Sequence, residues 1–296
     1  MSHKRSLFAL LVALLSSILW VERFDHPAPA AKTPVAGAES SGPERIVSGS
    51  TRADQVLWRL IESGFDPDRV IAVTGYSRRS GPPFDRFGAV ERLQDLEVVL
   101  SHRPELLLAN GVGDGRAMAR LRAEGVEVLD LGPLGGLDSF LEDILEIGRA
   151  VGAETPARTL ARDFEQAMRA VAADVPADAR PGGLVLIPYG DALFGGALGS
   201  SYHDVLKYGG LRDVATEAGF TGWPRLAPEQ VLGLDPQWIL TQAPEQVCAS
   251  AIGPQLSACP ERVVALSDSI LGDPGLGMLR AASALRRHVH GMPPAP

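Results

Sequence analysis

The feature that most constrains the fold is a regular alternation of short apolar runs with longer amphipathic ones. The runs that we predict as strands in the first part of the chain are Arg45 to Val47, Val70 to Val73, Glu105 to Ala109 and Val126 to Leu129. The amphipathic segments that we predict as helices are Arg52 to Ser63, Asp114 to Glu124 and Asp138 to Val151. Strand and helix in alternation predict a parallel sheet that is covered by helices on both faces.

A second alternating unit follows a break at Pro176 to Gly183. Its predicted strands are Leu184 to Ile187, Trp238 to Thr241 and Arg262 to Leu266, and its predicted helices lie near His203 to Tyr208, at Pro228 to Leu232 and from Leu276 to His290. Between the units, Glu154 to Asp174 contains no glycine and repeats apolar residues at helical spacing, which predicts one long helix.

The fold class is therefore α/β, with two Rossmann-like lobes of parallel sheets joined by one long rigid helix. We expect a first lobe at 44–152, the linking helix at 153–175 and a second lobe at 176–296. In open parallel sheets the ligand binds beyond the carboxyl ends of the strands, so two such lobes predict a ligand cleft between them.

The first 25 residues have the layout of a secretory signal, because Lys4 and Arg5 precede an uncharged apolar stretch from Leu7 to Val21. As a helix, this stretch would cover about 22 Å, less than the ~30 Å hydrocarbon core, which favours a cleaved signal peptide over an anchor. Residues 26–43 are rich in Pro, Ala, Ser and Gly and predict a flexible linker. We expect a periplasmic protein, either released or tethered to the inner membrane by an uncleaved segment.

Charge and motifs exclude several function classes. Acidic residues outnumber Lys and Arg by 36 to 28 without a block of like charge, so nucleic acid is not an expected partner. Gly111 to Gly115 imitates a dinucleotide fingerprint, but Arg116 stands where the third glycine belongs, so we expect no cofactor. Neither a nucleophile elbow nor a zinc-hydrolase motif occurs, so we expect no enzyme and no metal site. The alternative is an exported two-domain α/β enzyme that shares only the architecture.

The two cysteines, Cys248 and Cys259, enclose a short loop. Export favours a disulfide between them. Two reduced, separately buried thiols are the alternative.

The chain resembles the class III periplasmic binding proteins of ABC importers, the family that binds iron siderophores, haem and vitamin B12. The motifs that carry this resemblance are RIVSGSTRADQVLWRL, DRVIAVTGYSRRSGPP, DLEVVLSHRPELLLA, SSYHDVLKYGGLRDV and GWPRLAPEQVLGLDPQWIL. Their order and spacing match the vitamin B12 binding members most closely. The resemblance implies a carrier for an iron chelate, haem or cobalamin, whose partners are an ABC permease and its ATPase.

Two glutamates are implied as docking residues by the resemblance. In this family a Glu on each lobe contacts arginines of the permease, and these positions fall on Glu97 and Glu229. An Arg guanidinium binds a carboxylate through two charge-assisted hydrogen bonds, so one pair on each lobe would sense both lobes together.

The expected ligand residues follow the predicted strand ends. They are Tyr76, Arg78, Arg79, Asn110, Tyr189, Phe194 and Asp268, with Trp223 in the GWP segment. By motif position, Tyr76 and Trp223 match aromatic ligand contacts of B12-binding members, and Phe194 lies in the loop of another. Two further tryptophans of those members are replaced here near Glu91 and at Asn110, and the adjacent arginines suit an anionic iron chelate. Haem, ferric siderophore and cobalamin therefore all remain as cargo.

Overall fold

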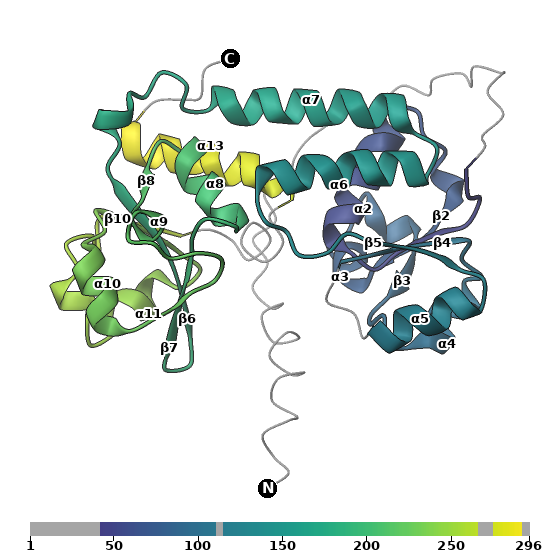
Figure 1. The fold of residues 1–296 in the computed structure, drawn as a ribbon, viewed down its shortest axis with the longest axis horizontal. Helices are drawn as coiled ribbons and strands as arrows, with labels where there is room; N and C mark the ends of the chain where they lie inside the picture. Colours follow the sequence, from purple (N-terminus) through teal and green to yellow (C-terminus); the bar gives the residue numbers. More distant parts are fainter. Residues whose placement is uncertain (1–41, 111–114, 266–274, 292–296) are drawn as a thin grey trace, which may run out of the picture. The chain divides into compact units, whose positions relative to one another are not determined.

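Sheet A, the sheet of the first lobe, has the strand order β3-β2-β1-β4-β5 with every neighbouring pair parallel (Figure 1). The computed structural model describes residues 42–110, 115–265 and 275–291. The strands are β1 (Ile46–Ser48), β2 (Val70–Thr74), β3 (Gly88–Val90), β4 (Leu106–Ala109) and β5 (Glu127–Asp130). The central strands β1 and β4 are buried along their whole length, as expected where helices cover both faces.

The helices of this lobe confirm the predicted alternation with slightly shifted ends. They are α2 (Thr51–Glu62), α3 (Gly75–Arg79), α4 (Leu96–Ser101), α5 (Gly115–Ala123) and α6 (Leu137–Ala150). A glycine at positive φ follows three of these helices: Gly64 at 104°, Gly125 at 85° and Gly152 at 76°. Residues that have a Cβ atom rarely adopt this backbone region. Each glycine therefore ends its helix and redirects the chain towards the next strand.

The predicted linking helix is α7 (Glu154–Ala170), which ends before the predicted Asp174. Beyond it, the Arg180 guanidinium donates hydrogen bonds to the carbonyls of Ala172 and Val175, so this backbone is held outside the helix. One part of α7 packs on α6, where the rings of Phe140 and Phe164 meet edge to face at 5.4 Å. The other part contacts helices of the second lobe (Figure 1).

Sheet B, the sheet of the second lobe, has the order β11-β10-β6-β7-β9, with β8 also paired to β6. The strands are β6 (Gly182–Tyr189), β7 (Ala192–Gly196), β8 (Arg212–Asp213), β9 (Arg225–Leu226), β10 (Trp238–Thr241) and β11 (Val263–Ala265). This sheet differs from the prediction of a parallel sheet, because β7 runs antiparallel to both β6 and β9. The cause is local: Tyr189 pairs with Ala192, so only Gly190 and Asp191 form the connection, with Gly190 at φ 56°.

The helices of the second lobe are α8 (Ser201–Tyr208), α9 (Val214–Glu217), α10 (Pro228–Leu234), α11 (Pro244–Cys248) and α13 (Gly277–His290). Cys248, the last residue of α11, forms a disulfide with Cys259, and their Cα atoms lie 5.6 Å apart. None of the helices in the described ranges is long and apolar enough to cross a bilayer.

The last helix, α13, also connects the two lobes, which the sequence did not indicate. At its start, the Leu276 N–H donates to Gln55 Oε1 of α2 at 3.1 Å. Near its end, His290 Nε2 lies 3.0 Å from the Gly210 carbonyl oxygen of the second lobe. One apolar core cluster accordingly includes residues from both sheets, from α7 and from α13. Residues from Ser40 onward form one compact unit, and the lobe boundaries at 152 and 176 stay a prediction.

Candidate functional site

Tyr76 lies on α3, directly beyond the carboxyl end of β2, and 42% of its surface is exposed. Thr74 caps this helix, since its hydroxyl oxygen accepts the Ser77 N–H at 3.1 Å. The Thr74 N–H and hydroxyl in turn donate to Asp54 Oδ2 at 3.1 and 2.6 Å. Asp54 of α2 thereby fixes the short helix that carries the first candidate aromatic residue.

Asp54 is fully buried, and burial raises the pKa of its carboxyl from 3.8 to about 6. Hydrogen bonds from Ser48, Ser77 and Thr74 lower the pKa again, but by less than burial raises it. An ionised carboxylate at this place therefore costs folding free energy, which is typical of groups kept for function. Asp54 carries no functional signal in the sequence, because a carboxylate in the first turn of a helix is ordinary at the surface.

The two arginines of α3 are not equivalent. The Arg79 guanidinium lies 2.5 and 2.6 Å from the two carboxylate oxygens of Glu91, which follows β3. The Glu91 carboxyl also fills the space beside Gly75, where a Cβ would lie 2.3 Å from it. Arg78 is exposed, and no ion pair links it to another described residue. Of the two positive charges expected here, Glu91 offsets that of Arg79, so the net positive charge is about that of Arg78 alone.

In the second lobe, Tyr189 and Phe194 lie on the β6–β7 hairpin. Tyr189 ends β6 and is 43% exposed, and its ring meets that of Phe194 edge to face at 6.4 Å. Phe194 lies within strand β7 and not in a loop as expected, because the hairpin connection is only two residues long. The pair still presents aromatic surface beyond the carboxyl end of β6.

Trp223 is half exposed and packs edge to face against Tyr202 of α8, with ring centroids 4.7 Å apart. Tyr202 is buried, and it lies so close to Gly196 that a Cβ there would be 2.7 Å from the Tyr202 Cβ. The next residue, His203, places Nδ1 2.9 Å from Asp213 Oδ2. Asp213 also caps α9, so the start of α8 is tied to its surroundings on several sides.

The remaining predicted ligand residues are Asn110 and Asp268. Asn110 directly follows β4 and is half-buried, at the same edge of sheet A as Tyr76. Asp268, with the start of its loop at Leu266, lies outside the described residues.

A cavity of about 500 Å³ lies at the opposite edge of sheet A. Its lining includes Glu105 and Glu127, at the amino ends of β4 and β5, and Arg149 and Glu154, at the end of α6 and the start of α7. None of the predicted ligand residues lines it. The aromatic residues at the strand ends are the better candidates for a ligand site, since they combine exposed apolar surface with rigid support.

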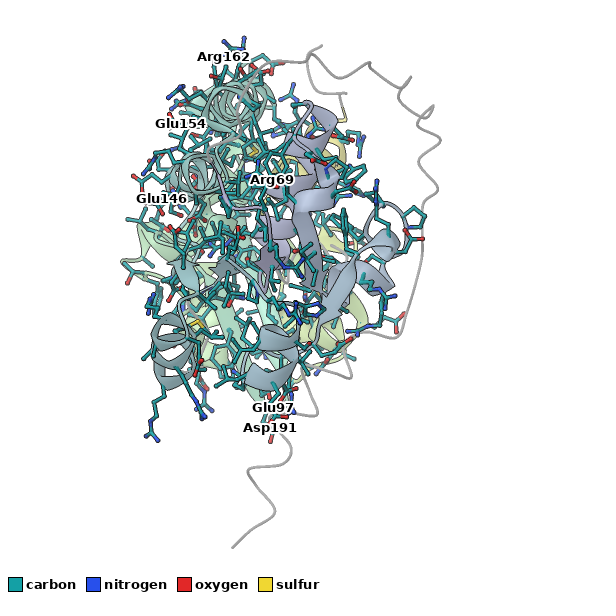
Figure 2. All side chains as sticks on the ribbon, turned by 90° about the vertical axis from the view of Figure 1, so that its right-hand side faces the viewer. Arg69, Glu97, Glu146, Glu154, Arg162 and Asp191 are labelled. Atoms are coloured by element: carbon teal, nitrogen blue, oxygen red, sulfur yellow. A yellow bond between two sulfur atoms is a disulfide. The ribbon has the colours of Figure 1, made fainter. Side chains whose placement is uncertain are left out.

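Glu97 and Glu229 occupy equivalent places in the two lobes. Each is exposed in the first turn of a short helix, α4 or α10, and each helix leads into a strand of its sheet, β4 or β10. Figure 2 shows Glu97 at the end of the molecule opposite Glu154 and Arg162 of α7.

The segments that carry the two glutamates are similar residue by residue. At matching positions they have a buried valine (Val99 and Val231), a proline (Pro104 and Pro236), and the residue before that proline at positive φ. These last residues, Arg103 at 49° and Asp235 at 42°, are the two non-glycine residues at positive φ in the described ranges. Such a conformation costs about 1 kcal/mol and persists only where the surroundings enforce it.

The same correspondence extends to hydrogen bonds. After the proline, the side chain of Glu105 accepts the Glu44 N–H at 2.6 Å, and that of Gln237 accepts the Gly182 N–H at 2.8 Å. In both lobes the bond joins this segment to the start of the neighbouring strand. Both lobes therefore present a glutamate from the same rigid local structure.

The described residues offer no cluster of three or more His, Cys, Asp or Glu side chains that could hold a metal ion. The arrangement instead consists of exposed aromatic rings on supported turns at the strand ends of two sheets. Such a surface can hold a large, flat ligand by stacking.

A model of the family described as periplasmic binding protein matches residues 89–266. A curated relative, the cobalamin-binding protein of Halobacterium salinarum, is 26% identical over 207 residues, which are 68% of this chain and 54% of the relative. The chain therefore spans about half the length of the curated relatives it matches.

Two solved structures show the same fold. A periplasmic haem-binding protein from Pseudomonas aeruginosa superposes with a TM-score of 0.70 at 21% identity, covering 86% of this chain and 95% of its own. The periplasmic vitamin B12 binding protein of Vibrio cholerae gives 0.65 at 22% identity, covering 84% and 97%. The two-lobed architecture expected from the sequence is confirmed by these similarities.

Proposed function

Since the chain belongs to the periplasmic binding protein family, we propose that it is the extracytoplasmic substrate-binding protein of an ABC importer. It captures a cobalamin, haem or iron chelate outside the cytoplasm and delivers it to a membrane permease. The observation that carries this proposal is the set of exposed aromatic residues, Tyr76, Tyr189 and Trp223, at the strand ends of both lobes. The curated relative that carries the name cobalamin-binding protein supports it.

Among these cargoes, the charges favour a flat ligand with little net charge. Arg79 is neutralised by Glu91, so the site offers less positive charge than a strongly anionic ferric chelate would need. Stacking against tyrosine and tryptophan does not require a charged ligand and scales with flat apolar area. We therefore place cobalamin first among the candidates, followed by haem and then by anionic siderophores.

We also propose that Glu97 and Glu229 dock the loaded protein onto arginines of the permease. The support is the repeated local structure, which holds both carboxylates exposed and in the same setting on each lobe. A rigid setting lowers the entropy lost when a carboxylate meets a guanidinium.

The test is a titration of the purified protein with cyanocobalamin, haemin and a panel of ferric siderophores, followed by tryptophan fluorescence and calorimetry. We expect saturable, stoichiometric binding of cyanocobalamin without product formation. Trp223→Ala should weaken binding about tenfold or more, as expected for the loss of one stacked aromatic contact. Trp58→Phe is the matched control, because Trp58 lies on α2 away from the strand ends and bonds Glu62. Turnover of a ligand, or no binding by any compound, would contradict the proposal.

A further inference from the structure

The amino end of α6 has no capping side chain of its own. Its N-cap residue is Gly136, at φ 138° and ψ −161°, and the first N–H groups of any helix lack partners within it. The Leu137 N–H instead donates to Asp204 Oδ2 at 2.6 Å. Asp204 lies sixty-seven residues later, on α8 of the second lobe. A side chain of one lobe thus caps a helix of the other, and Figure 1 shows α6 and α8 starting near each other below α7.

The turn before α6 is shaped to receive this carboxylate. A Cβ at Gly136 would lie 2.4 Å from Asp204 Oδ2, so only glycine permits the contact. Ser139 organises the same turn, because its hydroxyl accepts the Gly135 N–H at 2.9 Å and donates to the Gly136 carbonyl at 3.0 Å. The shape of this turn is therefore complementary to the Asp204 carboxylate.

The cap is also connected to a candidate ligand residue. Asp204 shares the first turns of α8 with Tyr202, the ring that supports Trp223. The segment that it meets, before Leu137, follows the carboxyl end of β5. Any movement of one lobe against the other at this place would shift the support of Trp223.

The surroundings of Asp204 disfavour its ionised form, so an ionised Asp204 lowers the stability of the folded state. Burial raises the pKa of its carboxyl more than the Leu137 N–H, His203 and Lys207 lower it, and Asp138 of α6 raises it further. A neutral residue would be the less costly choice if only packing mattered.

We propose that Asp204 is a positioning residue for ligand binding. By capping α6 it joins the second lobe to the first near the helix that supports Trp223, and we call this contact the clasp. This inference rests on the proposed ligand-binding function, but the clasp itself can be measured without a ligand. Asp204 does not contact the cargo. It fixes the distance between the aromatic residues of the second lobe and those of the first.

Hydrogen exchange of the ligand-free protein tests the clasp. In Asp204→Ala, the amides from Leu137 to Phe140 should exchange about tenfold faster than in the wild type, since a charge-assisted cap is lost. Asp204→Asn keeps an oxygen that can accept the Leu137 N–H, and it should stay within about twofold. Glu142→Ala is the matched control, an exposed carboxylate further along the same helix. Gly136→Ala disrupts the contact from the other lobe, with Asp204 intact.

The affinity for cyanocobalamin tests the positioning role. It should fall about fivefold or more in Asp204→Ala and in Gly136→Ala, and Asp204→Asn should restore it. Unchanged exchange in both disruptive variants, or faster exchange with unchanged affinity, overturns the proposal. A wild-type protein that binds neither cyanocobalamin nor haemin, while Asp204→Ala still exchanges faster, refutes the proposed cargo and leaves the clasp standing.

Discussion

Asp54 makes the folding stability of this protein depend on pH in a direction opposite to that of an ordinary surface carboxylate. Burial raises the pKa of its carboxyl in the folded state to about 6, against 3.8 in the unfolded chain. Above pH 6 both states are ionised, and the folded state bears the full cost of the buried charge. Between pH 6 and 3.8 the folded state takes up a proton that the unfolded chain does not, so this contribution to stability rises as the pH falls.

The magnitude follows from the shift of the pKa. A difference of that size corresponds to about 3 kcal/mol in total, of which about 2 kcal/mol appears between pH 7.5 and 4.5. For a chain of this size, 2 kcal/mol shifts the melting temperature by about 4–8 °C. Other carboxylates titrate in the same range, so the contribution must be measured as a difference from a variant that lacks it.

Asp54→Asn supplies that difference, because its amide is uncharged at every pH and can still accept the bonds from Thr74. The assay is urea unfolding of wild type and variant at several pH values between 7.5 and 4.5. We expect the wild type to gain about 2 kcal/mol relative to Asp54→Asn on acidification. Asp178→Asn, at an exposed carboxylate, is the control and should show no such trend. A difference that does not change with pH would refute the reasoning.

Three further outcomes are expected from the structure. The double variant Glu97→Ala, Glu229→Ala should keep its ligand affinity but lose most uptake in a transport assay with the cognate permease, and unchanged uptake would remove the docking assignment. Cys248→Ser opens a short disulfide loop and should cost about 3 kcal/mol of unfolding free energy, measured by urea unfolding under oxidising conditions. Glu91→Gln frees Arg79 and should raise the affinity for anionic ferric siderophores up to about fivefold, measured by calorimetry, whereas the affinity for cyanocobalamin should stay constant.

The elements of the fold were predictable wherever periodicity was strong. The buried runs of β4 and β10 and the amphipathic faces of α2 and α6 carry a signal in their own residues. Strand β7 was missed because its glycine-rich segment, Ala192–Gly196, has little of the β-branched character that marks a strand. The two-residue turn after Tyr189 brings β7 back beside β6. This pairing could not be predicted from the residues of β7 alone.

The candidate site was predictable in part, for a related reason. The rule for strand ends points to Tyr76 and Tyr189 because it depends on the local order of strand and loop, whereas Trp223 was expected from its motif position alone. The pairing of Arg79 with Glu91 depends on β3 lying beside β2, and β3 was not among the predicted strands. The contact of Asp204 with Leu137 joins two lobes and depends on how their helices meet. Contacts of this kind carry no signal in the spacing of residues.

Burial raises the pKa of two carboxylates, Asp54 of the first lobe and Asp204 of the second. Asp54 holds Thr74, the cap of the helix that carries Tyr76, and Asp204 shares a helix turn with Tyr202, which supports Trp223. Both pKa values are raised by burial, so each carboxylate lowers the stability of the folded state at neutral pH. A protein keeps such groups where a fixed geometry matters more than stability. In each lobe, a carboxylate of this kind lies close in the structure to the support of an exposed aromatic residue, as expected if Tyr76 and Trp223 serve ligand binding.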